Sequence, residues 1–120
     1  MDTNKPVTIR EILGELTATE GIVGSALVGL DGILVADNFV VDANLEKITA
    51  LMSSVYNTLE KVFGELKQGA VGQAWFETDR HNFLLQPTPV GLIVAVANHD
   101  APVGLIRLAV RRARSQLDKI

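Results

Sequence analysis

The sequence predicts an α+β domain in which helices pack on an antiparallel β-sheet. Short apolar segments occur in pairs around polar turns, once around Asp31-Gly32 and once around Asp79-Arg80-His81. Three segments with helical spacing precede, separate and follow these pairs, so the predicted order is α-β-β-α-β-β-β-α. Strands that are joined by short turns pair antiparallel, and the helices of such a chain cover the faces of the sheet.

The N-terminal region is predicted to combine a loose lead-in with a short helix. Residues 1–7 form the lead-in, and residues 8–120 form a single domain. Thr8 and Glu11 have the spacing of a capping box, in which the Thr8 hydroxyl accepts a free helix N–H while Glu11 reaches back. Apolar residues at helical spacing then predict a helix to about Thr19, which Gly21 ends.

The first pair of strands is predicted at Ile22–Leu30 and Ile33–Ala36. Asp31-Gly32 lies between them, and this dipeptide favours a type I′ turn with positive φ at both positions. The stretch is therefore expected to be a hairpin.

The glycines of this hairpin could also be read as a phosphate-binding loop. Gly24 and Gly29 have the spacing of the Walker motif, but Leu30 and Asp31 stand where Lys and Ser or Thr are required. A carboxylate at that position repels phosphate. A dinucleotide-binding motif is disfavoured as well, because the glycines lead into a second strand and not into a helix. The sequence thus favours a turn over a nucleotide site.

A long helix is predicted over Leu45–Leu66, capped by Asp42 or Asn44. One stripe of this helix is apolar and is wide enough to pack on a sheet, so these residues are expected in the core. The stripe comprises Leu45, Ile48, Met52, Val55, Leu59, Val62 and Leu66, widened by Leu51, Tyr56 and Phe63.

The opposite face of the long helix carries small residues. They are Ala50, Ser53, Ser54, Asn57 and Gly64, with Glu46 and Lys61 beside them. An interior glycine disfavours a helix by about 1 kcal/mol relative to alanine, whereas small residues allow another backbone to come close. The face is interpreted either as a helix–helix contact or as an ordinary solvated surface.

The C-terminal half is predicted to contain three strands and a last helix. Val71–Thr78 and Asn82–Gln86 flank the polar turn, Pro87-Thr88-Pro89 breaks the chain, and Leu92–Ala97 has the continuous apolar character of a central strand. Asp100 is expected to cap the last helix, with Pro102 in its first turn.

The strand at residues 71–78 is a candidate sheet edge. Alternation places Gln73, Trp75 and Glu77 on one side of it, and Gly72, Ala74, Phe76 and Thr78 on the other. The unpaired backbone of an edge strand can pair with a strand of a partner. Trp75 is expected either at such a contact or simply half-buried.

Composition and charge favour a cytoplasmic domain that binds neither nucleic acid nor membranes. The net charge is −3, there is no cysteine, and no apolar run precedes a cleavage site or approaches the length of a membrane helix.

The charge is unevenly distributed along the chain. Residues 101–120 hold five basic residues against Asp118, a balance of +4, which leaves −7 on residues 1–100. Arg107, Arg111, Arg112 and Arg114 lie away from the apolar face of the last helix. They are interpreted as a solvated face that complements the helix dipole or as a contact for an acidic partner.

No catalytic site or metal site is predicted, and no cofactor is expected. His81 and His99 lack carboxylates at ligand spacing and are interpreted as surface residues. Ser25, Ser53 and Ser54 lie outside any nucleophile-elbow pattern. The protein is therefore expected not to be an enzyme.

Three stretches, together with the long helix that follows the first of them, resemble the Roadblock/dynein light chain family, and most closely its prokaryotic MglB-like branch. They are "SALVGLDGILVA", "GQAWFETDRHNFLL" and "GLIVAVANHDAPVGLIRLAVRRARSQL", and the likeness spans residues 8–118. It implies a Roadblock/profilin-like fold, with a five-stranded antiparallel sheet, the long helix on one face and the two terminal helices on the other.

The resemblance also implies a homodimer with paired long helices and joined third strands. The implied interface comprises Ala50, Ser53, Ser54, Asn57, Lys61 and Gly64 of the long helix, and Gly72, Gln73, Ala74, Trp75 and Phe76 of the third strand. MglB-type members bind a Ras-like small GTPase across the paired helices and stimulate hydrolysis without supplying an arginine finger. The arginines of the last helix are accordingly not given a catalytic role.

The function predicted from the resemblance is regulation of a Ras-like small GTPase by a non-enzymatic homodimer. A scaffold or adaptor that joins proteins without altering GTP turnover is the alternative. A small-ligand sensor is a third reading that the sequence disfavours, because no convergent polar residues are evident.

Overall fold

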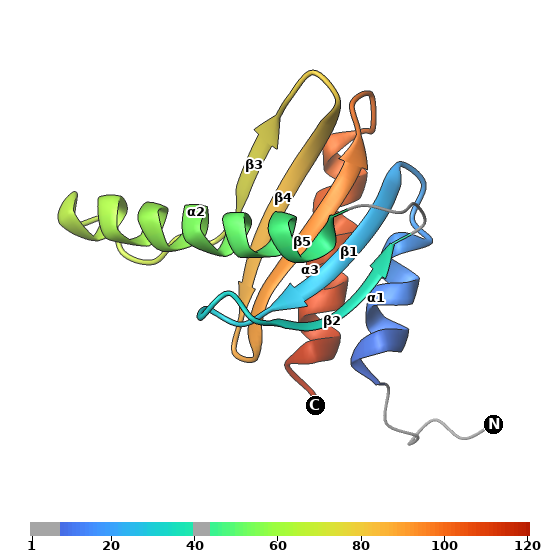
Figure 1. Cartoon of the computed structure of the whole chain (residues 1–120), viewed down its shortest axis with the longest axis horizontal. Coiled ribbons are helices and arrows are strands. Elements are labelled where there is room, and N and C mark those ends of the chain that lie inside the picture. The colour runs from blue at the N-terminus through green and yellow to red at the C-terminus, as the bar shows by residue number, and fades with distance from the viewer. Residues whose placement is uncertain (1–7, 40–43) are drawn as a thin grey trace.

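The computed structural model describes residues 8–39 and 44–120, and within them one five-stranded antiparallel sheet and three helices (Figure 1). The strand order across the sheet is β2-β1-β5-β4-β3. The strands are β1 (Ile22–Val28), β2 (Leu34–Phe39), β3 (Ala74–Glu77), β4 (His81–Thr88) and β5 (Gly91–Asn98), and the helices are α1 (Ile9–Thr17), α2 (Leu45–Glu65) and α3 (Val103–Leu117). The predicted α+β class and element order are confirmed. The expected lead-in at residues 1–7 lies outside the described residues.

The sheet lies between two helical layers. α1 and α3 pack side by side on one face, and α2 crosses the other face at a steep angle to the strands (Figure 1). The central strand β5 is buried from Leu92 to Ala97, as its continuous apolar sequence predicts.

Each face of the sheet has its own core. On the α1/α3 side the core includes Ile12, Leu13, Leu16, Leu27, Leu84, Ile93, Ile106, Val110 and Leu117. On the α2 side it is smaller and comprises Val28, Tyr56, Leu85, Leu92 and Val94. The strands therefore place alternate residues in two cores of unequal size.

The first hairpin forms where predicted, but the turn type predicted for it is wrong. The loop runs from Gly29 to Ile33, closed by Gly29 N donating to Ile33 O at 2.9 Å. Gly32 has a φ of 87°, whereas Asp31 does not have positive φ. Asp31 instead accepts a bond from Ile33 N on its Oδ1 at 3.0 Å. The bond between the Asp31 side chain and the backbone thus takes the place of the left-handed conformation that a type I′ turn would require at Asp31.

Two expectations around α1 and α2 are confirmed at their caps. Thr8 Oγ1 accepts from Glu11 N at 3.1 Å, and Asn44 Oδ1 accepts from Lys47 N at 3.4 Å. α1 ends at Thr17, two residues before the predicted end. Asp42, the other candidate cap of the long helix, lies outside the described residues.

Two proline-based predictions are wrong. Pro87 does not break the chain, because β4 continues through Pro87 to Thr88. β3 ends its pairing at Leu85, so the missing N–H of Pro87 deprives no partner in β3. α3 begins at Val103 with Pro102 at the N-cap, and no side chain caps it, so Asp100 does not serve as the predicted cap.

Candidate interaction surface

Two of the three serines weighed as nucleophiles serve structural roles. Ser25 is fully buried, and its Oγ donates to Leu13 O at 3.0 Å and lies 2.8 Å from Thr17 Oγ1. Ser53 is also buried, and its Oγ faces the carbonyls of Gly29 and Leu30 at 3.3 and 3.4 Å. Neither hydroxyl is bonded to a histidine or carboxylate that would activate it.

The histidines and carboxylates of the described residues form no metal-binding group. His99 Nδ1 lies 2.9 Å from Thr78 O, which ties the β3–β4 turn to the end of β5. Within residues 8–39 and 44–120, no helix is both long and apolar enough to span a membrane.

The small-residue face of α2 contacts the hairpin of the same chain. Ser53 bonds the β1–β2 turn, and Asn57 Nδ2 donates to Leu30 O at 3.1 Å. A backbone does come close to these small residues. For Ser53 and Asn57 it is the backbone of the β1–β2 turn and not that of a second helix. Ala50, Ser54, Lys61 and Gly64 are exposed.

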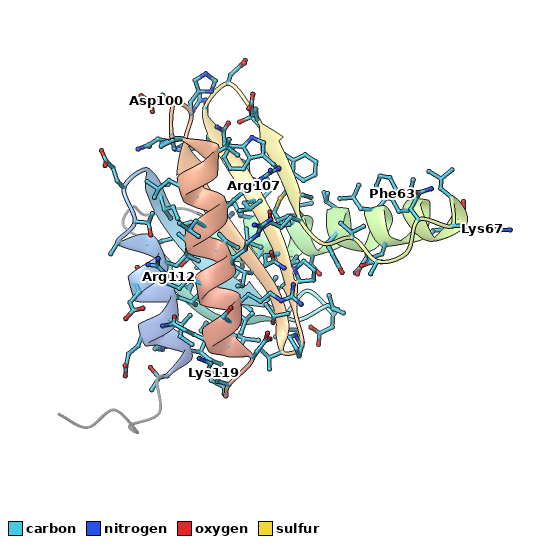
Figure 2. All side chains as sticks on the ribbon, turned by 180° about the vertical axis from the view of Figure 1, so that it is seen from behind. Phe63, Lys67, Asp100, Arg107, Arg112 and Lys119 are labelled. Atoms are coloured by element: carbon cyan, nitrogen blue, oxygen red, sulfur yellow. The ribbon has the colours of Figure 1, made fainter. Side chains whose placement is uncertain are left out.

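The apolar stripe of α2, which was expected in the core, is only partly covered, and that expectation is wrong for four of its ten residues. Leu51, Val62, Phe63 and Leu66 are 53, 42, 38 and 59% exposed. Only Thr49, Ser53 and Tyr56 of α2 are buried, and Tyr56, the last of them, lies near the middle of the helix. The second half extends past β3 and beyond the sheet, with Phe63 and Lys67 at its far end (Figures 1 and 2).

Simple dimensions explain this overhang. A helix of 21 residues is about 31 Å long at 1.5 Å per residue. Five strands spaced about 4.8 Å apart span only about 19 Å between their outer axes. A helix that crosses such a sheet must extend past it. The predicted length of the helix and the predicted number of strands were both available from the sequence. Comparing them would have indicated that part of the helix is left uncovered.

An apolar hollow lies where α2 passes the edge of the sheet. It has a volume of about 260 Å³ and is lined by Met52, Val55, Phe76, Thr78 and Phe83. The hollow continues the exposed stripe of α2 toward β3. Together they form one apolar surface, which we call the overhang surface: Leu51, Met52, Val55, Val62, Phe63, Leu66, Phe76 and Phe83.

β3 is an edge strand that pairs only with β4. The predicted alternation is confirmed, since Trp75 packs against the α1/α3 core and Ala74 and Phe76 against the α2 core. Trp75 Nε1 donates to Glu77 Oε1 at 3.2 Å. Gly72 and Gln73 precede the paired part of the strand. The other edge of β3 is open to a further strand.

Glu60 connects α2 to the segment that leads into β3. Its Oε1 accepts from the hydroxyl of Tyr56 and from Val71 N, the latter at 3.2 Å. Burial raises the pKa of Tyr56 to about 12, and the hydrogen bond to Glu60 and the charge of Glu60 act in the same direction. Glu60 thereby links α2 to the backbone of the segment that leads into β3.

These features define an α+β domain whose surface is marked by an apolar helix overhang and an open sheet edge. Residues 8–98 match the Roadblock/LC7 domain, and the chain belongs to this family. The order of the "ALVGLDGILVADN" hairpin, long helix and edge strand is thus that of a known domain.

Relatives and solved structures agree with this assignment. Two uncharacterised proteins of Methanocaldococcus jannaschii are each 29% identical over 109 residues, covering 91% of this chain and 96% of the relative. The structure of Myxococcus xanthus MglB superposes with a TM-score of 0.86 at 15% identity, covering 99% of this chain and 96% of the other. An MglB solved in a tetrameric arrangement gives 0.84 at 17% identity with the same coverage. The last two likenesses show the fold.

Proposed function

We propose that this protein is a homodimeric regulator of a Ras-like small GTPase and acts through paired α2 helices. The observation that carries the proposal is the overhang surface, an apolar helix face that the protomer itself leaves uncovered. Family membership supports it, because the MglB-like resemblance implies both the dimer and the GTPase.

The geometry of α2 supports self-association. Burying a large apolar side chain contributes roughly 1.5–3 kcal/mol, and each protomer exposes four such side chains on this helix. Two overhanging helices that cross antiparallel would cover each other's stripes. The same approach brings two β3 edges together, so that Gly72, Gln73, Ala74, Trp75 and Phe76 would line the junction.

The centre of the proposed helix pair differs from the one first expected. The exposed stripe lies on another side of α2 than the small residues, so Val62 and Leu66 would sit between the helices. Ala50, Ser54, Lys61 and Gly64 would lie outside this helix contact, on the other side of α2. Ser53 and Asn57 are engaged by the β1–β2 turn of their own chain, and we leave them out of the helix contact.

The dimer is tested by two arginine substitutions on neighbouring faces. Val62→Arg places a charge at the proposed centre, whereas Ser54→Arg adds the same charge on the small-residue face. Light scattering should give a dimer mass for the parent and for Ser54→Arg, and a monomer mass for Val62→Arg. A monomeric Ser54→Arg beside a dimeric Val62→Arg would instead support the small-residue interface, and a monomeric parent would refute the dimer.

The GTPase relationship is tested with candidate Ras-like proteins of the source organism. The purified protein should form a complex with one of them in the GTP-bound state and raise its rate of GTP hydrolysis. Val62→Arg should abolish the stimulation, because the proposed site requires both helices. No complex and no change in turnover would refute the proposal.

The scaffold function remains the alternative, and the same experiment separates the two. An exposed apolar helix and an open strand edge suit assembly with other proteins as well as they suit regulation. Binding with unchanged hydrolysis and unchanged nucleotide exchange would favour the adaptor. In either case we expect the protein in the cytoplasm with its partner.

A further inference from the structure

A polar groove lies on the other face of the sheet, between α3 and the start of β3. It has a volume of about 540 Å³ and is lined by Gly72, Gln73, Gln86, Arg111, Arg114, Ser115 and Asp118. This face carries α1 and α3, so the groove is separated from the overhang surface by the thickness of the sheet (Figures 1 and 2). α3 packs on β4 and β5, which leaves the strip of sheet near β3 open.

The groove contains buried amide groups. Gln86 is only 2% exposed, and its Nε2 donates to the carbonyl of the next residue, Pro87, at 2.9 Å. Gln73 Nε2 is buried and has no hydrogen-bond partner in the described structure. A buried N–H group without an acceptor is unfavourable, and such groups are rare in folded proteins. Gln73 therefore offers a donor that a ligand oxygen could satisfy.

Two arginines line the same groove as these amides. Arg111 and Arg114 are exposed and line the groove from α3, with Arg107 one turn before Arg111 on the same side of the helix. Only Arg114 lies in the last turn of α3, so complementing the helix dipole does not account for Arg107 or Arg111. Arg112 lies on the other side, toward α1, and lines a separate small hollow there (Figure 2).

We propose that this groove binds side-chain carboxylates of an acidic peptide segment in a partner protein. Guanidinium groups bind carboxylates in bidentate fashion, and an adjacent amide N–H adds a further donor. Asp118 at the rim lowers the positive charge of the groove, which favours a monoanionic carboxylate over a dianionic phosphate. The proposal does not depend on the GTPase, but the groove shares Gly72 and Gln73 with the proposed β3 junction of the dimer.

The test uses a fluorescein-labelled hexaglutamate peptide as the probe and fluorescence anisotropy as the measurement. The parent protein should bind it, whereas hexaglutamine should not bind. The double variant Arg111→Gln/Arg114→Gln should weaken binding about tenfold or more, because it removes two charge-assisted contacts. Arg112→Gln is the matched control outside the groove and should change the affinity less than about twofold.

A second variant separates binding from folding. Gln73→Met fills nearly the same volume without the unpaired N–H group, so the melting temperature should stay constant or rise while peptide affinity falls. An unchanged affinity in this variant would refute a role for Gln73. If Arg112→Gln lowers the peptide affinity as much as the double variant does, binding depends on the overall charge of the protein and the groove is refuted as the site. Tighter binding of inorganic phosphate or of a single-stranded oligonucleotide would overturn the assignment to a carboxylate peptide.

Discussion

The two halves of α2 share one amphipathic pattern but have different surroundings. In the first half, Ser53 is buried against the β1–β2 turn and Met52 packs at the margin of the core. At the junction of the halves, Tyr56 is buried against the sheet. In the second half, Val62 and Leu66 have the same periodicity and are exposed. The comparison teaches that a helical stripe reports which residues share a face, whereas the extent of the sheet decides how much of that face is covered.

On both faces of α2, the exposure of a residue can differ from what its polarity predicts. Ser53 looks suited to a solvated or intermolecular surface, yet it is the buried one, because the turn carbonyls of Gly29 and Leu30 accept from its hydroxyl. Leu66 looks suited to the core, yet it is 59% exposed. Residue polarity alone therefore gives the wrong exposure for these two residues of α2.

The largest expected effect comes from breaking the contact of the first half. Ser53→Arg forces a charge into a buried site against two carbonyls and should lower the free energy of unfolding by about 3 kcal/mol or more. Ser54→Arg adds the same charge one residue later at an exposed position and should change it by less than about 0.5 kcal/mol. Urea unfolding followed by circular dichroism measures both. Equal stabilities would contradict the placement of Ser53.

A moderate effect is expected from truncating one apolar residue in each half. Met52→Ala should cost about 1–2 kcal/mol, since Met52 is partly buried against the core. Leu66→Ala should cost less than about 0.5 kcal/mol in the monomer. Both are best measured in the Val62→Arg background, where dimer formation is expected to be absent. A large loss for Leu66→Ala there would mean that the overhang packs within the protomer.

The smallest effect concerns the junction of the two halves, where Tyr56 bonds Glu60. Tyr56 is the only tyrosine, so the ultraviolet absorbance of tyrosinate reports its titration directly. Its pKa is raised to about 12, against about 10 in an unfolded chain. Because the folded state favours the neutral phenol, the contribution of Tyr56 to stability is complete below about pH 10. It is lost as the pH rises through about 12.

Glu60→Gln should lower this pKa, since it removes the negative charge beside the phenol, while the part due to burial remains. Glu65→Gln changes the net charge equally at an exposed position of the same helix and should leave the titration unaltered. If both variants titrate like the parent, Glu60 does not act on Tyr56.

Local patterns predicted most of the fold. The cap at Thr8, the apolar run of β5 and the alternation of β3 each depend on neighbours within a few residues, and each is confirmed. The errors occur where several local solutions are open to the same residues. Asp31 could enter a left-handed turn or bond its own backbone, and Pro87 could break a strand or lie where no partner needs its N–H group.

The candidate surfaces were less accessible from the sequence. The edge position of β3 and the basic side of α3 were recognised, but the groove between them requires Gln73, Gln86 and Arg111 to come together from separate segments. The exposed stripe of α2 was assigned to the core, because periodicity alone gives no information on where the sheet ends.

The chain itself therefore specifies its elements, their order and the family to which they belong, since hydrogen-bonding caps and apolar spacing act over a few residues. The tertiary structure decides which side of α2 the turn covers, where the helix leaves the sheet and which amide is left without a partner. The first and the last of these outcomes depend on contacts between segments far apart in the sequence. Where the helix leaves the sheet depends on the relative sizes of a helix of about 31 Å and a narrower sheet. No local pattern encodes that difference.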